Sequence, residues 1–354
     1  MKVLLLDPSI PDYRLHIFNL IGNKVDLTIA HNGKIRTKEN LKFKQLQIPQ
    51  KKLGPFSYYP INLHKLCNNY DIVISDANIR YIDRNFLILN PYRKYKWITW
   101  GIGVSASYNK EFDEDKRLDF IRHFIFKMAN AQIFYSDYPI NKYIKAGFDP
   151  KSLFVANNTT YVDFNENKEF KKFKLLFVGT LYKQKRIYEL LDAYLKYSRY
   201  SSSVSPLEII GDGTEYRNIK IWIEANGLQN NITLHGSIFD HNMLEKHFRE
   251  SYACISPGQA GLSVLTSMGY GTPYITKKDA ITGGEIFNIK NNKNGVLYSN
   301  SNDLADILKD IEQDSIKYIK MGENAREYYK LYRQPKQMIQ AFIDACNYVL
   351  NNNK

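Results

Sequence analysis

Basic side chains and glycines follow the ends of several short apolar segments in this sequence. In the stretch FVGTLYKQKRIYELLDAY, Gly179 ends a β-rich run, and Lys185 and Arg186 precede an amphipathic helical pattern. A glycine allows a ligand to approach the backbone, and cationic side chains near a helix start bind phosphate. The pattern predicts a phosphate-binding turn; the alternative is a loop whose lysines lie in solvent.

A second turn of this kind lies in SPGQAGLSVLTSMGYGTPYIT, after the strand-like run YACIS. Gly258 and Gly261 permit close approach of a ligand. A helix predicted from Leu262 leaves the N–H groups of Gly261, Leu262 and Ser263 unpaired, and these groups and the helix dipole favour a phosphate. We therefore expect a diphosphate between this helix start and Lys185, with the Ser263 hydroxyl adding a hydrogen bond.

A third turn follows the strand pattern LEII and contains Gly211, Asp212 and Gly213. It is a weaker signal, because Asp212 is also a common helix-capping residue. Polar or glycine-containing turns recur at the ends of predicted strands, at 7–11, 101–105, 179–185, 211–214, 235–237 and 256–262. In open α/β sheets ligands bind beyond the carboxyl ends of the strands, so this coincidence predicts a functional site there.

Short β-rich runs alternate with helical patterns along the chain, which indicates parallel α/β structure. In the first half we predict strands at 2–7, 24–30, 71–75, 96–101, 131–136 and 152–156, and helices near 15–21, 117–128 and 140–146. The alternation restarts after a polar segment at 164–174, with strands at 174–179, 207–213, 232–238, 252–258, 272–276 and 295–299.

A chain of 354 residues has room for two domains. We expect an α/β protein of two Rossmann-like domains that face a central cleft. The first is expected to span 1–165 and the second 172–335. A C-terminal helix at about 336–354 is expected to pack back on the first domain.

The second half resembles the nucleotide-sugar domain of glycosyltransferase family 4, whose members are retaining enzymes of the GT-B fold. The resemblance covers roughly residues 177–298, in the family's order, through FVGTLYKQKRIYELLDAY, LEIIGDG, ITLHGSI, SPGQAGLSVLTSMGYGTPYIT and GGEIFNIKNNKNGVLY. The first half agrees more loosely, through SIPDYRLHIFNLI and SLFVANNTTYVDF. The resemblance implies transfer of a sugar from a nucleoside-diphosphate sugar, with no further cofactor.

This chain departs from the family pattern at three positions. The family usually has two glutamates eight positions apart, where this chain has Gly258 and Thr266, and often an arginine where it has Thr180. The family lysine matches Lys185. Glu285 is the nearest-placed replacement carboxylate, and its alternative role is that of a helix N-terminal acid.

The resemblance implies a front-face reaction in which a leaving phosphate oxygen takes the acceptor's proton. The protein then stabilises charge on the diphosphate and holds the substrates in register. The predicted catalytic residues are Lys185, Arg186 and Glu285. The predicted donor-binding residues are Gly179, Thr180, Lys185, Gly211, Gly258, Gln259, Ala260, Gly261, Leu262, Ser263 and Thr266. The lost glutamates are expected to alter sugar and ribose recognition more than this step.

The acceptor is expected in the first domain. Asp12, Tyr13, Arg14 and His16 follow the first predicted strand, and Arg14 is a candidate contact for an acceptor phosphate. Each of these residues also has a structural alternative. The loop WGIGVS adds Gly101 and Gly103, which permit close approach.

The net charge is +13, and between Lys34 and Lys52 there are seven lysines and arginines against one glutamate. An aromatic segment, LGPFSYYPINLHKL, follows. This combination favours an anionic inner-membrane surface and an acceptor that is a glycan or a polyprenyl-diphosphate-linked glycan. A solvated basic face is the alternative; nucleic acid is disfavoured, because no nucleic-acid module is recognisable.

The N-terminus has too few apolar residues for a signal peptide, and no apolar run is long enough to span a membrane. The three cysteines lack metal-site spacing. We expect a cytoplasmic protein, peripheral on the inner face of the membrane. The D-x-D triplet at Asp113 and Asp115 precedes a helical pattern and is interpreted as acidic helix capping, so no metal is expected.

The first hypothesis is therefore a retaining glycosyltransferase of bacterial capsule, O-antigen or exopolysaccharide synthesis. A catalytically silent nucleotide-sugar-binding scaffold is the second, because the two glutamates are lost, and a sugar-nucleotide epimerase of related fold is a further alternative. A nicotinamide-dependent oxidoreductase is disfavoured, because no G-x-G-x-x-G follows the first predicted strand.

Overall fold

The computed structural model describes residues 1–36, 40–105, 112–114, 117 and 119–352. The chain forms two compact units. The N-terminal unit contains Met1–Ser105, Asp113–Tyr161 and the chain from Pro335 onward, and the C-terminal unit contains Phe112 and Val162–Gln334. Within the described residues, no helix is both long and apolar enough to cross a membrane.

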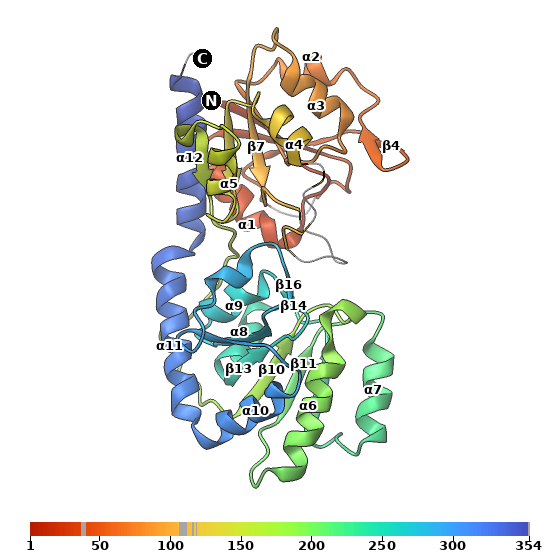
Figure 1. The fold of residues 1–354 in the computed structure, drawn as a ribbon, viewed down its shortest axis with the longest axis vertical. Helices are drawn as coiled ribbons and strands as arrows, with labels where there is room; N and C mark the ends of the chain where they lie inside the picture. The colour runs from red at the N-terminus through yellow and green to blue at the C-terminus, as the bar shows by residue number, and fades with distance from the viewer. Residues whose placement is uncertain (37–39, 106–111, 115–116, 118, 353–354) are drawn as a thin grey trace. The chain divides into compact units, whose positions relative to one another are not determined.

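A parallel seven-stranded sheet forms the centre of the N-terminal unit, in the order β3-β2-β1-β6-β7-β8-β9. Figure 1 labels one of its inner strands, β7. Its strands are β1 (Lys2–Leu6), β2 (Asp26–His31), β3 (Lys44–Gln47), β6 (Ile72–Ser75), β7 (Lys96–Gly101), β8 (Ala131–Phe134) and β9 (Leu153–Val155). The central strands are buried almost throughout, as expected for a parallel sheet covered on both faces.

Side chains alternate between two cores along β1, as the pleat requires. Val3 and Leu5 face a core completed by α1 and α12, whereas Leu4 and Leu6 face α2, α3, α4 and α5. These helices are α1 (Asp12–Gly22), α2 (Leu63–Cys67), α3 (Ile82–Leu89), α4 (Asp119–Phe126), α5 (Ile140–Lys145) and α12 (Pro335–Asn351), with a 3₁₀ turn η1 (Pro150–Ser152). The C-terminal helix thus packs on the first unit through residues such as Phe342 and Cys346.

Several short elements have no counterpart in the sequence interpretation. These are β3, α2, α3 and an antiparallel hairpin of β4 (Lys51–Leu53) and β5 (Phe56–Tyr58). The hairpin projects from the unit in Figure 1. Its strands have three residues each, too few to show a periodicity of two.

A parallel six-stranded sheet forms the centre of the C-terminal unit, in the order β12-β11-β10-β13-β15-β17. Its strands are β10 (Lys174–Val178), β11 (Leu207–Ile210), β12 (Ile232–Gly236), β13 (Ser251–Ile255), β15 (Tyr274–Lys277) and β17 (Gly295–Tyr298). The order reverses between β10 and β13, which makes their carboxyl ends the switch point where ligands of such sheets bind.

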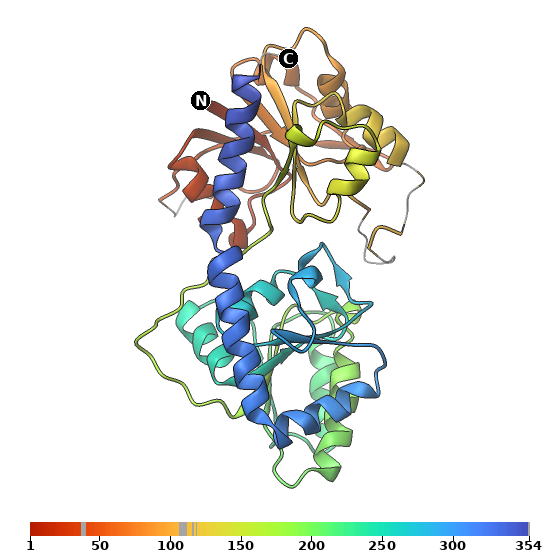
Figure 2. The same cartoon turned by 60° about the vertical axis from the view of Figure 1, so that its left-hand side comes forward.

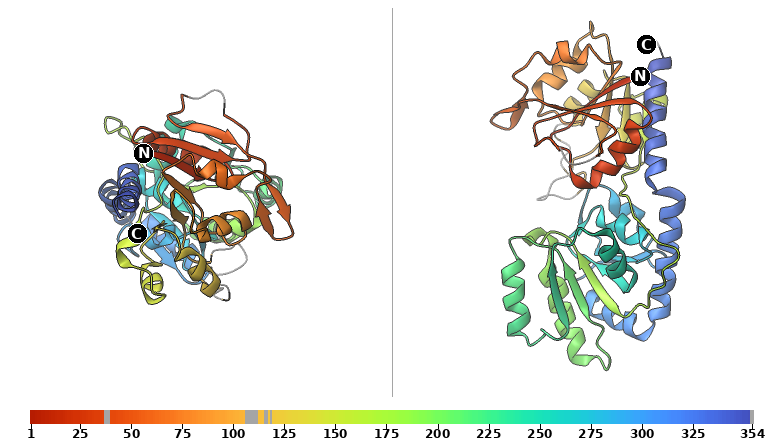
Figure 3. Two further views of the ribbon diagram at one scale, coloured as in Figure 1. Left: turned by 90° about the horizontal axis from the view of Figure 1, so that it is seen from above. Right: turned by 180° about the vertical axis from the view of Figure 1, so that it is seen from behind.

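Helices cover both faces of this sheet, as Figures 2 and 3 show. One core involves α6, α7 and α10, the other α8 and α9, and α11 contributes to both. The helices are α6 (Ile187–Tyr200), α7 (Tyr216–Ala225), α8 (His241–Arg249), α9 (Ser263–Gly269), α10 (Asp303–Gln313) and α11 (Ser315–Tyr332), with 3₁₀ turns η2 (Lys183–Lys185) and η3 (Glu285–Asn288). A two-stranded parallel ladder joins β14 (Gln259–Ala260) to β16 (Ile281–Thr282).

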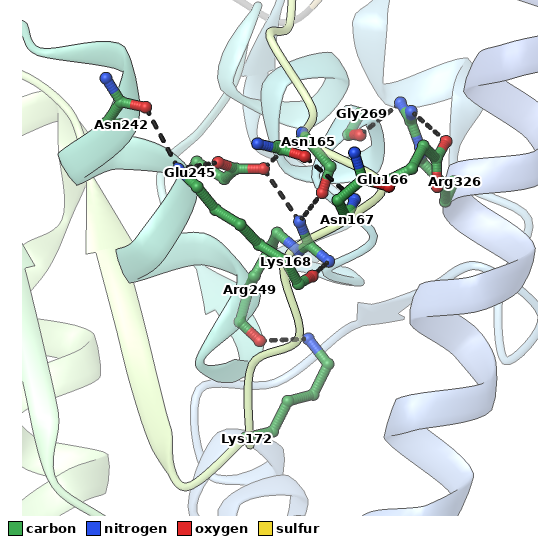
Figure 4. A network of polar contacts seen from close by, with 10 residues as sticks. All are labelled: Asn165, Glu166, Asn167, Lys168, Lys172, Asn242, Glu245, Arg249, Gly269 and Arg326. Atoms are coloured by element: carbon green, nitrogen blue, oxygen red, sulfur yellow. Dashed lines mark hydrogen bonds and ion pairs between the residues drawn. The ribbon is translucent and has the colours of Figure 1, made fainter.

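The polar segment at 164–174, interpreted from sequence as the junction, is anchored on the C-terminal unit (Figure 4). Arg249 donates to the carbonyl oxygen of Asn165 at 2.6 Å and lies over the rings of Phe164 and Phe170. The Lys172 ammonium donates to the carbonyl oxygens of Arg249 and Ser251. The division between the units therefore falls at 161/162, earlier than the predicted limits of 165 and 172.

Candidate active site

The carboxyl end of β10 carries a buried lysine. The chain leaves the strand at Gly179 and turns through η2, which leaves Lys185 only 7% exposed. The ammonium lies against Gly179, where an added Cβ would stand 3.0 Å from Nζ, and 6.0 Å from the ring centroid of Tyr182. No described residue accepts a hydrogen bond from this ammonium or forms an ion pair with it.

Burial lowers the pKa of Lys185 to about 8, so the side chain remains a cation at neutral pH. A buried charge without a partner is unfavourable. Such perturbed groups are concentrated at functional sites. The structure thus leaves a buried cation at a sheet switch point, where an anion from outside the chain would supply the partner.

Gly258 makes the burial of Lys185 possible. Its N–H group donates to the carbonyl oxygen of Lys185 at 3.1 Å. A Cβ at position 258 would lie 2.2 Å from the carbonyl oxygen of Gln184 and 2.7 Å from the carbonyl carbon of Lys185. A side chain such as glutamate at this position is thus sterically excluded by the turn that carries the lysine.

We expect Gly258→Ala to destabilise the protein by about 2 kcal/mol, because backbone atoms of η2 must move to admit the methyl group. Thermal unfolding measures this effect. Gly261→Ala is the matched control, because a Cβ there would meet no atom within 4 Å. Equal unfolding midpoints for the two variants would show that the close packing at Gly258 is not required.

Three amides beside the turn also lack partners in the described part of the chain. No described residue accepts a hydrogen bond from the N–H groups of Gly261, Leu262 or Ser263, whereas those of Val264 and Leu265 donate within the turn. The Ser263 hydroxyl was expected to donate a hydrogen bond to phosphate. In the structure its proton is donated within the chain, to the Tyr274 hydroxyl.

Tyr274 determines where the Ser263 proton goes. The Tyr274 hydroxyl donates its one proton to the carbonyl oxygen of Gln259 at 3.0 Å, so it accepts from the Ser263 hydroxyl at 2.8 Å. The Thr266 hydroxyl likewise donates to the carbonyl oxygen of Leu262. These two hydroxyl groups therefore hold the local backbone, and the amides remain as the free donors.

The other predicted donor residues lie around the same turns. The Gln259 side chain accepts from the Tyr182 hydroxyl at 2.5 Å, Ala260 is buried in β14, and Thr180 is exposed. Gly211 serves chain packing, because a Cβ there would lie 1.9 Å from the carbonyl oxygen of Gly179. The glycine is thus explained by the close approach of two turns of the chain.

Arg186 and Glu285 each have a partner in the chain. Arg186, at a positive φ of 51°, forms an ion pair of 3.1 Å with Asp279. Glu285 is 6% exposed and accepts the N–H of Gly283 at 2.9 Å, closing the turn before η3. Glu285 thus makes the local contacts of a helix N-terminal acid, which was the alternative role named for it from the sequence.

One described group combines side chains that bind metals, namely Glu208, His235 and His247. The Lys174 ammonium lies 2.8 Å from Glu208 Oε2 and 3.4 Å from His247 Nδ1. Lys174 also pairs with Glu250 at 2.8 Å. A cation of the chain itself thus occupies this group, which we interpret as a structural ion network.

In the N-terminal unit, the residues after β1 have structural contacts. Asp12 pairs with Arg36 at 2.5 Å, and His16 stacks on Tyr161 with ring centroids 3.9 Å apart. Tyr13 is 52% exposed and remains accessible to a ligand.

Arg14, expected to meet an acceptor phosphate, is only 7% exposed. It donates to Asn158 Oδ1 at 2.8 Å, and its guanidinium lies 5.0 Å from the Tyr135 ring centroid and 5.7 Å from that of Trp100. These contacts connect the start of α1 to β7 and to the segments that follow β8 and β9, which gives Arg14 a structural role.

Two glycines of the WGIGVS loop differ in their surroundings. Near Gly101 a Cβ would meet only the Ala77 nitrogen, at 3.8 Å, so the position is open to a ligand. At Gly103, with a φ of 80°, a Cβ would clash with Phe134 at 2.7 Å and Pro139 at 2.9 Å. Gly103 is therefore explained by packing.

The predicted D-x-D triplet is described only in part, because Asp115 lies outside the described residues. Asp113 is buried and pairs with Lys142 at 2.7 Å.

Asp7 and Asp76 were not among the predicted site residues. They directly follow β1 and β6, whose last residues Leu6 and Ser75 are paired in the sheet. Burial raises the pKa of Asp7 to about 6, and the nearby Asp76 carboxylate contributes to the rise. Arg84 donates to Asp76 and to the Tyr59 hydroxyl. The runs KVLLLD and DIVISD each place an aspartate directly after a predicted strand. This position was the sequence signal that could have identified Asp7 and Asp76 as candidate site residues.

Solved structures share this fold at low sequence identity. Anabaena HepE in complex with UDP has a TM-score of 0.73 at 14% identity, covering 98% of this chain and 100% of that one. A Rickettsia africae glycosyltransferase has 0.74 at 14% identity, covering 99% of each chain. The S. aureus TarM G117R mutant, in complex with Fondaparinux, alpha-GlcNAc-glycerol and UDP, has 0.68 at 13%, covering 98% of this chain and 99% of that one. The chain therefore has the two-domain α/β fold of GT-B glycosyltransferases.

Residues 160–328 match the model of the family described as glycosyl transferases group 1. This range nearly coincides with the C-terminal unit, which holds Lys185 and the free amides. No curated protein matches the sequence. The family match and the fold together support a glycosyltransferase enzyme.

Proposed function

We propose that the chain is a retaining glycosyltransferase that moves a sugar from a nucleoside-diphosphate sugar to a glycan acceptor, in the synthesis of a bacterial surface polysaccharide. The observation that carries this proposal is the buried ammonium of Lys185 at the carboxyl end of β10, which has no partner among the described residues. The diphosphate of the donor has the charge and size to be that partner.

In the proposed step, the bond between the anomeric carbon and the diphosphate oxygen breaks. The acceptor hydroxyl oxygen bonds to the same face of that carbon, and its proton passes to the leaving phosphate oxygen. Lys185 and the amides of Gly261, Leu262 and Ser263 stabilise the charge that develops on the diphosphate. Arg186, which already pairs with Asp279, contributes less.

The acceptor is proposed to bind the N-terminal unit at the ends of β1 and β6. The carboxylates of Asp7 and Asp76 are good acceptors for sugar hydroxyl groups, and Tyr13 adds an exposed aromatic face. We propose a lipid-linked glycan, because the hairpin from the basic segment exposes Leu53 and Phe56 next to Lys51 and Lys52. Such a protein would be peripheral on the inner face of the cytoplasmic membrane.

A turnover assay tests the proposal. The protein is incubated with a panel of sugar nucleotides and an acceptor extract, with Mg²⁺ or with EDTA, and nucleotide release and product anomer are measured. We expect release without metal and a product with the anomeric configuration of the donor. Binding without turnover would favour the silent scaffold, and solvent-derived label in the recovered sugar would favour the epimerase.

The affinity for the nucleotide is also expected to depend on pH. If the ammonium form of Lys185 binds the diphosphate, Kd rises on the order of tenfold from pH 7 to pH 9, as the group with a pKa of about 8 loses its proton. Calorimetry at both pH values measures this change. A Kd that stays constant for the wild type would remove Lys185 from the donor site.

A further inference from the structure

We infer that the outer face of α4 is a docking surface for an anionic lipid bilayer. This inference deepens the proposed function, on which it rests, by naming the surface through which the N-terminal unit would reach a lipid-linked acceptor. The hairpin of β4 and β5, from which the lipid-linked acceptor was proposed above, is the competing surface for lipid contact, and the experiment below compares the two.

A stripe of large apolar side chains lies in solvent along α4. Phe120 and Phe124 are one turn apart, and Met128 lies in the following turn; they are 71%, 69% and 53% exposed. The opposite side of the helix packs on the unit, where Phe126 is fully buried and His123 contacts Tyr143. Contiguous exposed apolar side chains of this size mark an interaction surface.

The surroundings of the stripe are cationic. Arg93 donates to the carbonyl oxygen of Met128 at 2.8 Å, which places the loop after α3 beside the end of the stripe. In that loop Lys94 is exposed and Tyr92 is 85% exposed. Met128 also lines a surface depression together with Lys94 and Lys96. Apolar and cationic groups therefore share one surface.

The local charge balance favours an anionic partner. Residues 90–96 and 112–151 contain ten lysines and arginines against six aspartates and glutamates. Asp119, the aspartate on α4, is neutralised by Arg122 at 2.8 Å and Lys142 at 2.5 Å. Each Lys or Arg near an anionic bilayer contributes about 1 kcal/mol to binding.

A bilayer explains this composition better than a protein partner does. Protein interfaces are depleted of lysine at their centres. Here Lys127 lies in sequence between Phe124 and Met128, and it is exposed. Lysines bound to a lipid surface keep their ammonium groups at the phosphates while aromatic rings enter the interface.

Vesicle co-sedimentation tests the inference, with vesicles of phosphatidylcholine alone and of phosphatidylcholine with phosphatidylglycerol. We expect the wild type to sediment with the anionic vesicles and to be released by salt. Phe120→Ser with Phe124→Ser is expected to lower the partition coefficient at least about tenfold, because two rings no longer enter the interface. Phe239→Ser with Tyr200→Ser is the matched control, since these rings are 80% and 78% exposed in the other unit.

Equal sedimentation of the α4 variant and the wild type, or no wild-type binding to anionic vesicles, would overturn the inference. A loss of self-association in the α4 variant without any vesicle binding would instead assign the face to a second copy. The double variant Leu53→Ser with Phe56→Ser tests the hairpin in the same assay. If only this variant loses binding to anionic vesicles, the inference is also overturned. Vesicle binding requires no sugar transfer, so failure here is distinguishable from failure of the proposed reaction.

Discussion

Lys185→Met is expected to abolish sugar transfer while making the protein more stable. The rate of transfer should fall on the order of 100-fold or more, because the variant loses a preorganised cation at the developing diphosphate charge. The free energy of unfolding should rise by roughly 1–3 kcal/mol, because an apolar chain of similar length replaces a buried ammonium that has no partner among the described residues.

The same lysine gives the stability of the wild type a pH dependence. Burial lowers the pKa of Lys185 to about 8 in the folded state, below the ordinary 10.5. Between these values the unfolded state binds more protons, so the free energy of unfolding rises with pH across this window. The variant lacks this contribution, so its gain in stability is full below pH 8 and disappears as pH rises to about 10.5.

Turnover and urea unfolding at pH 7 and pH 10 measure both effects. Retained turnover in Lys185→Met would remove the lysine from the donor site. A lower unfolding midpoint at pH 7 would show that the ammonium is satisfied within the folded protein, and the argument from its missing partner would fail.

Lys174→Met is expected to have the opposite effect on stability. Lys174 is also buried, at 2% exposure, but it pairs with Glu208 and Glu250, both at 2.8 Å. Its loss leaves two carboxylates without their cation, which should lower the free energy of unfolding by about 3 kcal/mol or more. The two lysines are thus matched controls for each other within one unit.

Acid should reproduce part of this loss in the wild type. Burial alone would raise the pKa of Glu208, but hydrogen bonds from His247 and Lys174 prevail and lower it to about 2. The corresponding stabilisation is present above the ordinary pKa of 4.5 and disappears as pH falls toward 2. Urea unfolding of the wild type at pH 7 and pH 3 measures this loss of stability.

The Lys174→Met prediction has its own contradicting outcome. If the variant were as stable as the wild type at pH 7, the ion network would not stabilise the C-terminal unit.

The sheets and the turn at Lys185 could be predicted because their signals are local. Apolar runs such as KVLLL and KLLFV end in glycine, proline or charge, and the central strands follow these runs. The hairpin of β4 and β5 could not be predicted, because strands of three residues are too short to show alternation of apolar and polar residues. The sequence of this segment has the basic and aromatic composition of a loop.

Side-chain partners distant in sequence were beyond such reasoning. The Ser263 hydroxyl was assigned to phosphate, but Tyr274 accepts its proton. Gly258 was interpreted as a lost glutamate, although the carbonyl oxygen of Gln184 leaves space only for a glycine. In both cases the deciding atom belongs to another strand or turn, so only the fold shows it.

Nucleotide binding by calorimetry tests the central claim most directly. The wild type and Lys185→Met are titrated with UDP, GDP, dTDP, CMP and NAD, without and with Mg²⁺. We predict that one nucleoside diphosphate binds the wild type without metal and that the variant binds it at least about tenfold more weakly. No binding of any nucleoside diphosphate to the wild type, or equal affinity in the variant, would contradict the claim that Lys185 holds the donor diphosphate.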